Sequence, residues 1–574
     1  MLFQSVLIGV VTAFAVYFLH WMVGTITRMC QGLGTSLSDA KYTLYVLLPL
    51  PFVGIVLSYL FQRIFGGKTF TKSLSSLILN LDRRKSNIPF SETFTHIFSS
   101  ALSVGFGGSA GLEAPSVLTG SAIASNITRF FKLDTMPRSI LVGCGGAAAI
   151  AGIFDSPIAG VLFVAEGLLP EISVSALVPI VLSSASSSVV SRLLTGHDVF
   201  FANAITQWNG GDVLPTLALG IVCAVVGVCV IRSTGFMADI LCRMFSRPLL
   251  RVLCGAALLC VLLAVFPYLR GQGYFYISRL LTNEHGFVTQ PPYLLSWLPP
   301  EALPYVIVLT AIFMKAIVSA MTINCGDGGM FAPTVFIGAF TGFAFAHMVN
   351  MLGWCSVSSA NFTALGMCGV FTSVMRTSLA GIFLIAETTG GYKLLVPLML
   401  VSGVSWYVGR LFEAHSIYRR SLFKLHLVAD DNDNAFLKRM CVGDCILPLK
   451  VTLKPTDTLK YAEVLVRRNI RNGVDLYPIV NEAGRLIGML PYDKLLAVTL
   501  RSTVPSSYFV SEIMDLPDGM MHSKDGLDLA LARMEVWHLK YVPVSDQATG
   551  RFLGVASKDS IFDKYRKMNA EIER

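Results

Sequence analysis

GGSAGLEAPS, residues 107–116, places glycines, a proline and one carboxylate within apolar sequence. Glycines let a backbone approach a ligand closely, and proline suits the first turn of a helix. A helix that begins near Pro115 would aim its unpaired N–H groups and the positive end of its dipole at the glycines. The stretch therefore predicts an anion position at a helix N-terminus, which Glu113 could itself occupy. The alternative is that Glu113 merely complements the helix dipole.

The stretch has a second copy at residues 329–338. Both copies fit the pattern Gly-x-[Glu/Phe]-Ala-Pro-[Ser/Thr]-Val-x-x-Gly. Each copy is followed by another shared pattern, IAGVLFVAE at 158–166 and LAGIFLIAE at 379–387. In transporters, corresponding Gly/Pro-interrupted segments in two repeats indicate a midplane site, with half-helix N-termini aimed at an anion. We therefore expect an internal duplication whose two copies converge on one anion site.

The composition is that of a polytopic membrane protein. Of the 574 residues, 53% are hydrophobic and 14% are charged, and the mean hydropathy is +0.63. This is too apolar for a soluble protein of this length. The net charge of +9 comes from Lys and Arg that lie mostly in short connections and in the C-terminal part, so we interpret it as a topology signal and not as a nucleic-acid surface. The 12 cysteines show no metal-ligand spacing, which predicts buried thiols and no metal site.

Apolar runs predict a helical membrane domain over residues 1–425, with repeats at about 40–195 and 213–412. The run at 4–26 has no basic segment before it, so we expect a membrane helix and not a signal peptide. Several runs are too short to span the bilayer, as a midplane site built from half-helices requires. We predict that 269–303, with its prolines, is a loop between the repeats. The other runs are expected at 43–65, 93–106, 115–131, 139–166, 172–194, 213–235, 247–268, 304–322, 333–351, 360–375, 378–388 and 394–412.

These motifs resemble those of the CLC family of chloride channels and chloride/proton exchangers, over most of residues 1–425. Members carry Gly-x-Glu-[Gly/Ala]-Pro with a gating glutamate, and Gly-x-Phe-x-Pro whose backbone N–H groups coordinate chloride. The resemblance implies an all-α membrane fold of two inverted-topology repeats, with chloride as substrate and no cofactor. It also implies a homodimer in the lipid bilayer, each subunit with its own pore. By this resemblance Glu113 is the gate, and the anion-binding residues are Gly111, Leu112, Met330 and Phe331.

Three further positions are compared with the family. A family tyrosine closes the inner side of the chloride site, and Tyr418 matches it, although a Tyr there can also be an interface anchor. Where the family has the serine of Gly-Ser-Gly-Ile-Pro, this chain has Lys68, which we expect to point to the cytoplasm. Family exchangers usually have a second, proton-transferring glutamate where this chain has Gly167. Because of Gly167 we expect channel-like chloride movement, with chloride/proton exchange as the alternative.

Glu166 and Glu387 occupy equivalent positions at the ends of apolar runs in the two repeats. Carboxylates in membrane segments are costly and usually functional, but a helix-end Glu can also be hydrogen-bonded to backbone N–H groups. We expect the structural role for both, because their duplication suggests a shared requirement of the fold.

After about residue 425 the sequence becomes charged and alternating, which predicts an α/β domain in two similar halves, 436–500 and 506–574. The halves resemble a tandem CBS pair, which some CLC proteins carry on the cytoplasmic side. Such pairs often bind adenine nucleotides through a Thr or Ser three residues before an Asp. Here Leu490 precedes Asp493 and Ala556 precedes Asp559, so we expect a structural, dimer-stabilising module, with binding of an adenine nucleotide as the alternative.

Two other functional classes fit the sequence less well than an anion pathway. A CBS-regulated cation transporter needs several oxygen ligands deep in the apolar runs, and the sequence offers few. An intramembrane enzyme needs a nucleophile with a base or a metal set, and the nine histidines form no such cluster. The sequence therefore predicts an integral membrane chloride pathway, in the plasma or inner membrane if the source is prokaryotic.

Overall fold

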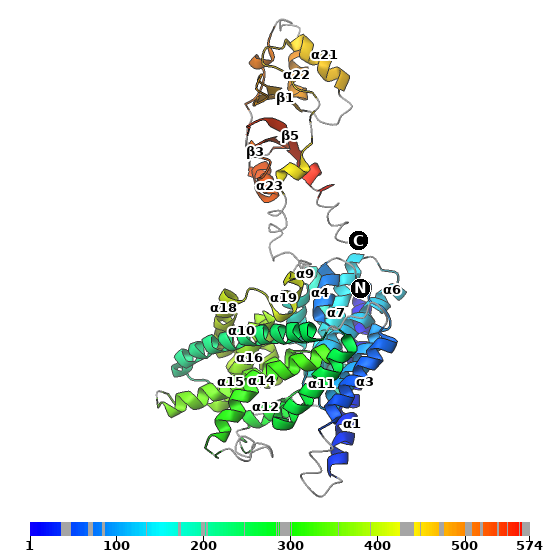
Figure 1. The fold of residues 1–574 in the computed structure, drawn as a ribbon, viewed down its shortest axis with the longest axis vertical. Coiled ribbons are helices and arrows are strands. Elements are labelled where there is room, and N and C mark those ends of the chain that lie inside the picture. Colours follow the sequence, from blue (N-terminus) through cyan, green and yellow to red (C-terminus); the bar gives the residue numbers. More distant parts are fainter. Residues whose placement is uncertain are drawn as a thin grey trace. The chain divides into compact units, whose positions relative to one another are not determined.

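Two units, Met1–Leu427 and Val428–Arg574, make up the computed structural model (Figure 1). It describes residues 1–564 except 36–47, 67–72, 83–85, 134, 170–173, 197–200, 202–204, 246, 283, 285, 287–298, 300, 354, 391, 425–440, 448, 450, 470–475, 500–507, 517–519, 537–538, 548 and 562.

The first unit is built from apolar helices. Eight helices in its described part are long and apolar enough to cross a membrane, and four shorter apolar helices accompany them. The mixture confirms a mostly helical membrane fold that includes half-length helices. The α-helices are α1 (Leu2–Thr35), α3 (Leu50–Phe65), α4 (Leu74–Asp82), α5 (Glu92–Gly105), α6 (Glu113–Phe130), α7 (Thr135–Phe154), α8 (Pro157–Phe163), α9 (Val174–Thr195), α10 (Val213–Met244), α11 (Pro248–Val265), α12 (Tyr274–Leu281), α14 (Leu303–Cys325), α15 (Phe331–Met351), α16 (Ser359–Met375), α17 (Ser378–Thr388), α18 (Leu395–Phe412) and α19 (Ile417–Lys424).

Two expectations about these helices were wrong. The run expected at 139–166 is two helices, because Asp155 has a φ of 51° and Pro157 cannot continue the preceding helix. The stretch 269–303, expected to be a loop, contains α12. This helix begins after Gly273, whose φ is 94°, and its residues Ile277, Leu280 and Leu281 are buried at helical spacing.

The final glycine of the repeated pattern lies at a helix crossing in both copies. A Cβ atom at Gly120 would lie 2.3 Å from the carbonyl oxygen of Gly145, where α6 packs on α7. A Cβ atom at Gly338 would lie 2.4 Å from the carbonyl oxygen of Gly366, where α15 packs on α16. Only glycine permits backbones to approach this closely, so each copy fixes the crossing behind its own helix N-terminus.

The second unit has two α/β halves. The first half contains α21 (Leu459–Asn469), the antiparallel pair β1 (Leu476–Val480) and β2 (Leu486–Pro491), and α22 (Tyr492–Thr499). The second half contains α23 (Leu527–Val536) and a sheet of order β3 (Met521–His522), β4 (Tyr541–Ser545) and β5 (Phe552–Ser557).

The halves of the second unit exchange short segments. Leu447, near the start of the first half, bridges to Val555 on β5, and Asp515, near the start of the second half, bridges to Met489 on β2. The two hydrophobic cores reflect this exchange, because Val442 is buried in the second core and Val510 in the first. Each hydrophobic core is therefore completed by residues from the start of the other half.

An anion position between two helix N-termini

Gly111 and Gly329, equivalent residues of the two copies, meet in an isolated antiparallel bridge. Each backbone N–H donates to the other residue's carbonyl oxygen at 2.8 Å. The bridge brings the start of α6, at Glu113, to the start of α15, at Phe331. First-turn N–H groups have no intrahelical acceptor, and both helix dipoles are positive at this end. An anion between the two N-termini is thus stabilised without a cationic side chain.

The Glu113 side chain occupies this position. It is 1% exposed, and its Oε2 accepts a hydrogen bond from the Ala332 N–H of α15 at 3.4 Å. Its Oε1 accepts a hydrogen bond from the hydroxyl of Tyr274 on α12 at 2.5 Å. A Cβ atom at Gly111 would lie 2.0 Å from Glu113 Oε2, so only glycine leaves room for the carboxylate. The carboxylate is placed where a transported anion would also bind, so the two would compete.

The motif residues around Glu113 contribute in different ways. The N–H of Gly111 is already donated to Gly329, so this glycine makes room for the carboxylate and its amide is not available to an anion. Leu112 and Met330 are the N-cap residues of α6 and α15 and are both buried. Their anion-binding role stays a prediction.

The Phe331 ring anchors the start of α15. Its centroid lies 5.4 Å from the Phe154 ring, 5.9 Å from the Phe163 ring and 4.6 Å from the Phe371 ring. Offset and edge-on aromatic pairs of this kind stabilise a fixed geometry. Phe331 therefore holds the backbone donors of α15 in place from the side.

Tyr418, on α19, reaches the same site. Its buried hydroxyl lies near the Met330 amide and the Glu113 carboxylate without completing a hydrogen bond to either. A buried hydroxyl without a partner is costly, and an anion beside it would supply the acceptor. The carbonyl oxygen of Tyr418 accepts a hydrogen bond from Ser75 at the start of α4, at 2.7 Å, which ties α19 to α4.

The other two positions compared with the family have different outcomes. Lys68 lies outside the described residues. Gly167 lies in a π-helical turn, Val164–Leu168, that follows α8. A Cβ atom at Gly167 would meet Thr377 Cγ2 at 3.4 Å and Phe163 Cε2 at 3.9 Å, which are ordinary contacts. The fold would therefore accept the start of a side chain at Gly167.

Glu166 and Glu387 have the structural role expected of them. Glu166 accepts hydrogen bonds from the N–H groups of Leu379 and Ala380, both at 3.0 Å, at the start of α17. Glu387, at the end of α17, accepts hydrogen bonds from the N–H groups at the start of α8, from Ile158 at 3.2 Å and Ala159 at 3.0 Å. Each carboxylate thus caps a helix of the other repeat.

Sequence reasoning missed Tyr274 and Lys315. The ammonium group of Lys315, 0% exposed on α14, donates to the carbonyl oxygens of Leu269 and Gly271, both at 2.9 Å. It also lies 4.8 Å from the centroid of the Phe336 ring. These contacts hold the turn that precedes α12 and so position Tyr274. A lysine inside an apolar run was a usable signal, since such residues in membrane segments are usually functional.

Known proteins resemble this chain over the same region. The family described as "Voltage gated chloride channel" matches residues 53–410. A protein of Ralstonia nicotianae described as "Putative chloride channel protein ClcB-like" is 27% identical over 334 residues, 56% of this chain and 73% of that protein. The H(+)/Cl(-) exchange transporter ClcA of Vibrio parahaemolyticus is 25% identical over 327 residues, 55% of this chain and 66% of that protein.

A solved structure extends the likeness to the fold. The crystal structure of a CLC-type fluoride/proton antiporter matches with a TM-score of 0.60 and 25% identity, covering 73% of this chain and 96% of that one. The family match spans more than half of the chain and includes the glycine bridge, Glu113 and the start of α15. The chain therefore belongs to the voltage-gated chloride channel (CLC) family, whose members are anion transport proteins and not enzymes.

Proposed function

We propose that this protein exchanges chloride for protons across a membrane. The observation that carries the proposal is the Glu113 carboxylate, buried at the N-terminus of α15 where an anion would bind. The comparisons favour chloride/proton exchange over channel-like movement, which the sequence alone had favoured. A relative is named an H(+)/Cl(-) exchange transporter, and a 25% identical structure is a proton antiporter.

One carboxylate can couple the two ions because it competes with the anion for one position. Ionised, Glu113 fills the space between the helix N-termini and excludes chloride. Protonated, it loses its charge and with it most of its attraction to those N-termini, so it can leave the space to chloride. Chloride and the ionised carboxylate then alternate, and each proton bound or released at Glu113 accompanies anion movement. The buried hydroxyl of Tyr418 can donate to the anion.

The C-terminal unit fits a structural CBS pair on the cytoplasmic side of a homodimer. Leu490 on β2 and Ala556 on β5, which replace the ribose-contacting residues, are both 0% exposed and lie in the two hydrophobic cores. Side chains buried in this way do not reach a nucleotide. We therefore propose a module that supports subunit association without an adenine nucleotide.

The zero-current potential of the full-length protein in proteoliposomes tests the exchange. At a fixed chloride gradient, we expect each unit of pH gradient to move this potential by about 59 mV, multiplied by the protons moved per cycle and divided by the charges moved per cycle. A channel would hold the potential at the chloride equilibrium value at every pH gradient, which would contradict exchange. Replacing chloride by fluoride identifies the anion, and we expect the larger coupled flux with chloride.

Tyr274→Phe is expected to strengthen chloride binding about tenfold, which corresponds to 1.4 kcal/mol. The reason is that a hydrogen bond to a charged group contributes about 1.5–3 kcal/mol. Without the Tyr274 hydroxyl, the Glu113 carboxylate is bound less tightly in the position for which it competes with chloride. Phenylalanine keeps the ring contacts with Phe154 and Phe201. Isothermal titration with chloride measures the change, with Tyr276→Phe on the same helix as control. Weaker binding in Tyr274→Phe would mean that its hydroxyl contacts the anion and not the gate.

A further inference from the structure

A row of polar side chains follows one face of α5, the helix that leads to the glycine loop. Glu92, His96, Ser99 and Ser103 are separated by four, three and four residues, so they lie along one stripe of the helix. All four are buried, with exposed fractions of 6%, 0%, 0% and 0%. Eleven residues of helix span about 16 Å, about half of the roughly 30 Å hydrocarbon core. Such a stripe is costly in a membrane unit and needs a reason.

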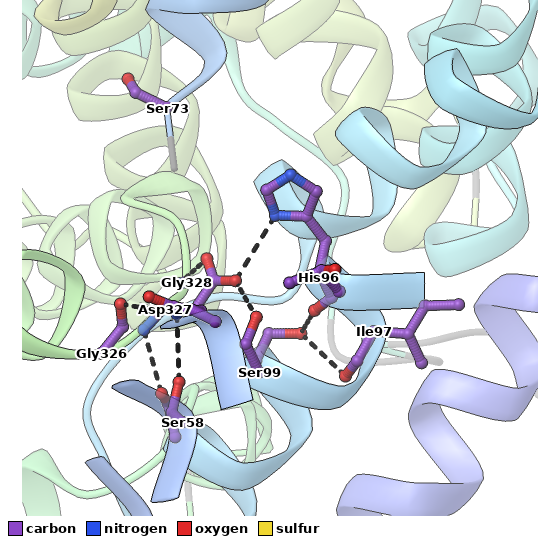
Figure 2. A network of polar contacts seen from close by, with 12 residues as sticks. Ser58, Ser73, His96, Ile97, Ser99, Gly326, Asp327 and Gly328 are labelled. Carbon is purple, nitrogen blue, oxygen red and sulfur yellow. Dashed lines mark hydrogen bonds and ion pairs between the residues drawn. The ribbon is translucent and has the colours of Figure 1, made fainter. Parts of the chain in front are cut away.

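The row meets a carboxylate of the second repeat. His96 Nδ1 lies 3.4 Å from Oδ2 of Asp327, which is also 0% exposed, and the Ser99 hydroxyl donates to the same oxygen. Figure 2 shows both side chains directed at this carboxylate. The backbone N–H of Asp327 donates to Ser103 Oγ at 2.9 Å, and Asp327 Oδ1 accepts from the Gly328 N–H at 2.8 Å. Asp327 is two residues before Gly329, the partner of Gly111 in the bridge.

The other end of the row lies at the surface of the membrane unit. Glu92 begins α5, one helical turn before His96 on the same stripe of the helix. The nearby Asn87 and Phe90 are exposed. Arg129, an exposed residue in the last turn of α6, donates to Asn87 and to the Ile88 carbonyl oxygen. The α5 start is thus at the end of α6 opposite Glu113. The row leads from there to the glycine loops.

Two neutral side chains in the described part of the chain also lie beside the row. From α3, Gln62 donates to the Gly326 carbonyl oxygen and to Ser58 Oγ, both at 3.2 Å. From α6, Asn126 donates to Thr93 Oγ1 at 3.4 Å. Within the described part of the chain, Glu92, His96 and Asp327 are therefore the titratable groups that we assign to this row.

We propose that Glu92, His96 and Asp327 form a proton-binding row that connects the surface end of α5 with the gate, in place of the glutamate that Gly167 lacks. The inference rests on the proposed chloride/proton exchange. It does not need a side chain at Gly167, because the row lies on α5 and meets the same pair of loops as Glu113. The route of the proton is thereby separate from the position that chloride and Glu113 share.

Each proton step in the row balances. A proton from the Glu92 carboxylic acid passes to neutral His96, which leaves a carboxylate and an imidazolium. His96 then releases its Nδ1 proton to Asp327 Oδ2, which leaves a neutral imidazole and a carboxylic acid. Water carries the proton from Asp327 to the Glu113 carboxylate, and Asp327 is again ionised. The reverse order takes a proton from Glu113 to the surface.

The test measures proton and chloride fluxes together in proteoliposomes containing the full-length protein. His96→Gln removes the titratable ring, and Asp327→Asn keeps the shape and an acceptor for the Gly328 N–H. We expect either variant to lower the ratio of proton flux to chloride flux by about tenfold or more, equivalent to 1.4 kcal/mol. The matched control is His20→Gln, which removes a histidine of α1 that hydrogen-bonds within its own helix. Its flux ratio is expected to match that of the wild type.

The possible outcomes test the proton-binding row and the proposed chloride/proton exchange separately. If the wild type shows coupled fluxes and a folded His96→Gln or Asp327→Asn keeps the wild-type ratio, the row is overturned and the exchange stands. A loss of both fluxes together at an unchanged ratio also overturns it, because it indicates a purely structural contact. A wild type without proton flux overturns both proposals. If neither of these variants folds, Glu92→Gln at the end of the row nearest the surface gives the same comparison.

Discussion

Glu113→Gln is expected to abolish proton flux and to make chloride flux independent of pH. Glutamine has nearly the size of glutamate but carries no charge at any pH, so it neither takes up a proton nor binds as an anion at α15. Chloride then enters without having to displace a carboxylate. In the proteoliposome assay we expect the ratio of proton flux to chloride flux to fall by at least about tenfold, which is 1.4 kcal/mol. Unlike the variants of the α5 row, this substitution is expected to change the proton flux and the pH dependence of the chloride flux together.

The control for this variant is Glu301→Gln, which neutralises an exposed carboxylate at the start of α14 and should leave both fluxes as in the wild type. A Glu113→Gln protein that keeps the wild-type pH dependence of chloride flux would show that another group is the gate. The row of Glu92, His96 and Asp327 gives a further comparison. Its variants should lose proton flux while the pH dependence that arises at Glu113 itself persists.

The sequence predicted the features of the site that are local. The repeated pattern places a carboxylate, glycines and a helix start within ten residues, and these are the parts that meet at the Gly111 and Gly329 bridge. The capping role of Glu166 followed from its duplication at Glu387. In both cases the residues involved are either close together in the chain or are equivalent residues in two copies of one motif.

The partners that sequence reasoning missed come from distant parts of the chain. Tyr274 reaches Glu113 across 161 residues, and Ser99 reaches Asp327 across 228. Such pairs depend on how helices pack, which no local spacing encodes. The α12 helix was hidden for a second reason, because it is only eight residues long and shares a stretch with four prolines. The Gly111 amide also had a partner, Gly329, that only the fold could reveal.

We expect the largest loss of stability when either of the two capping carboxylates, Glu166 or Glu387, is removed. Glu166→Ala leaves the N–H groups of Leu379 and Ala380 without their acceptor, and Glu387→Ala does the same to Ile158 and Ala159. An unsatisfied buried donor costs about 1–3 kcal/mol, and the partial exposure of these helix starts lets water compensate in part. We therefore expect each substitution to lower the free energy of unfolding by about 2–4 kcal/mol. The midpoint of thermal unfolding of the purified protein in detergent measures the loss.

Two further measurements test whether Glu166 and Glu387 are only structural. They are the stability of the double alanine variant and the proton and chloride fluxes of the glutamine variants. The α8 and α17 helices pack on each other, so the two losses should not add fully, and the double variant should be less destabilised than the sum of the singles. Glu166→Gln and Glu387→Gln keep one acceptor oxygen and should be milder, with the wild-type ratio of proton to chloride flux. A changed ratio in a stable Glu166→Gln protein would give Glu166 a part in proton movement. Since Glu166 adjoins Gly167, that result would place the proton route at the end of α8 and not along α5.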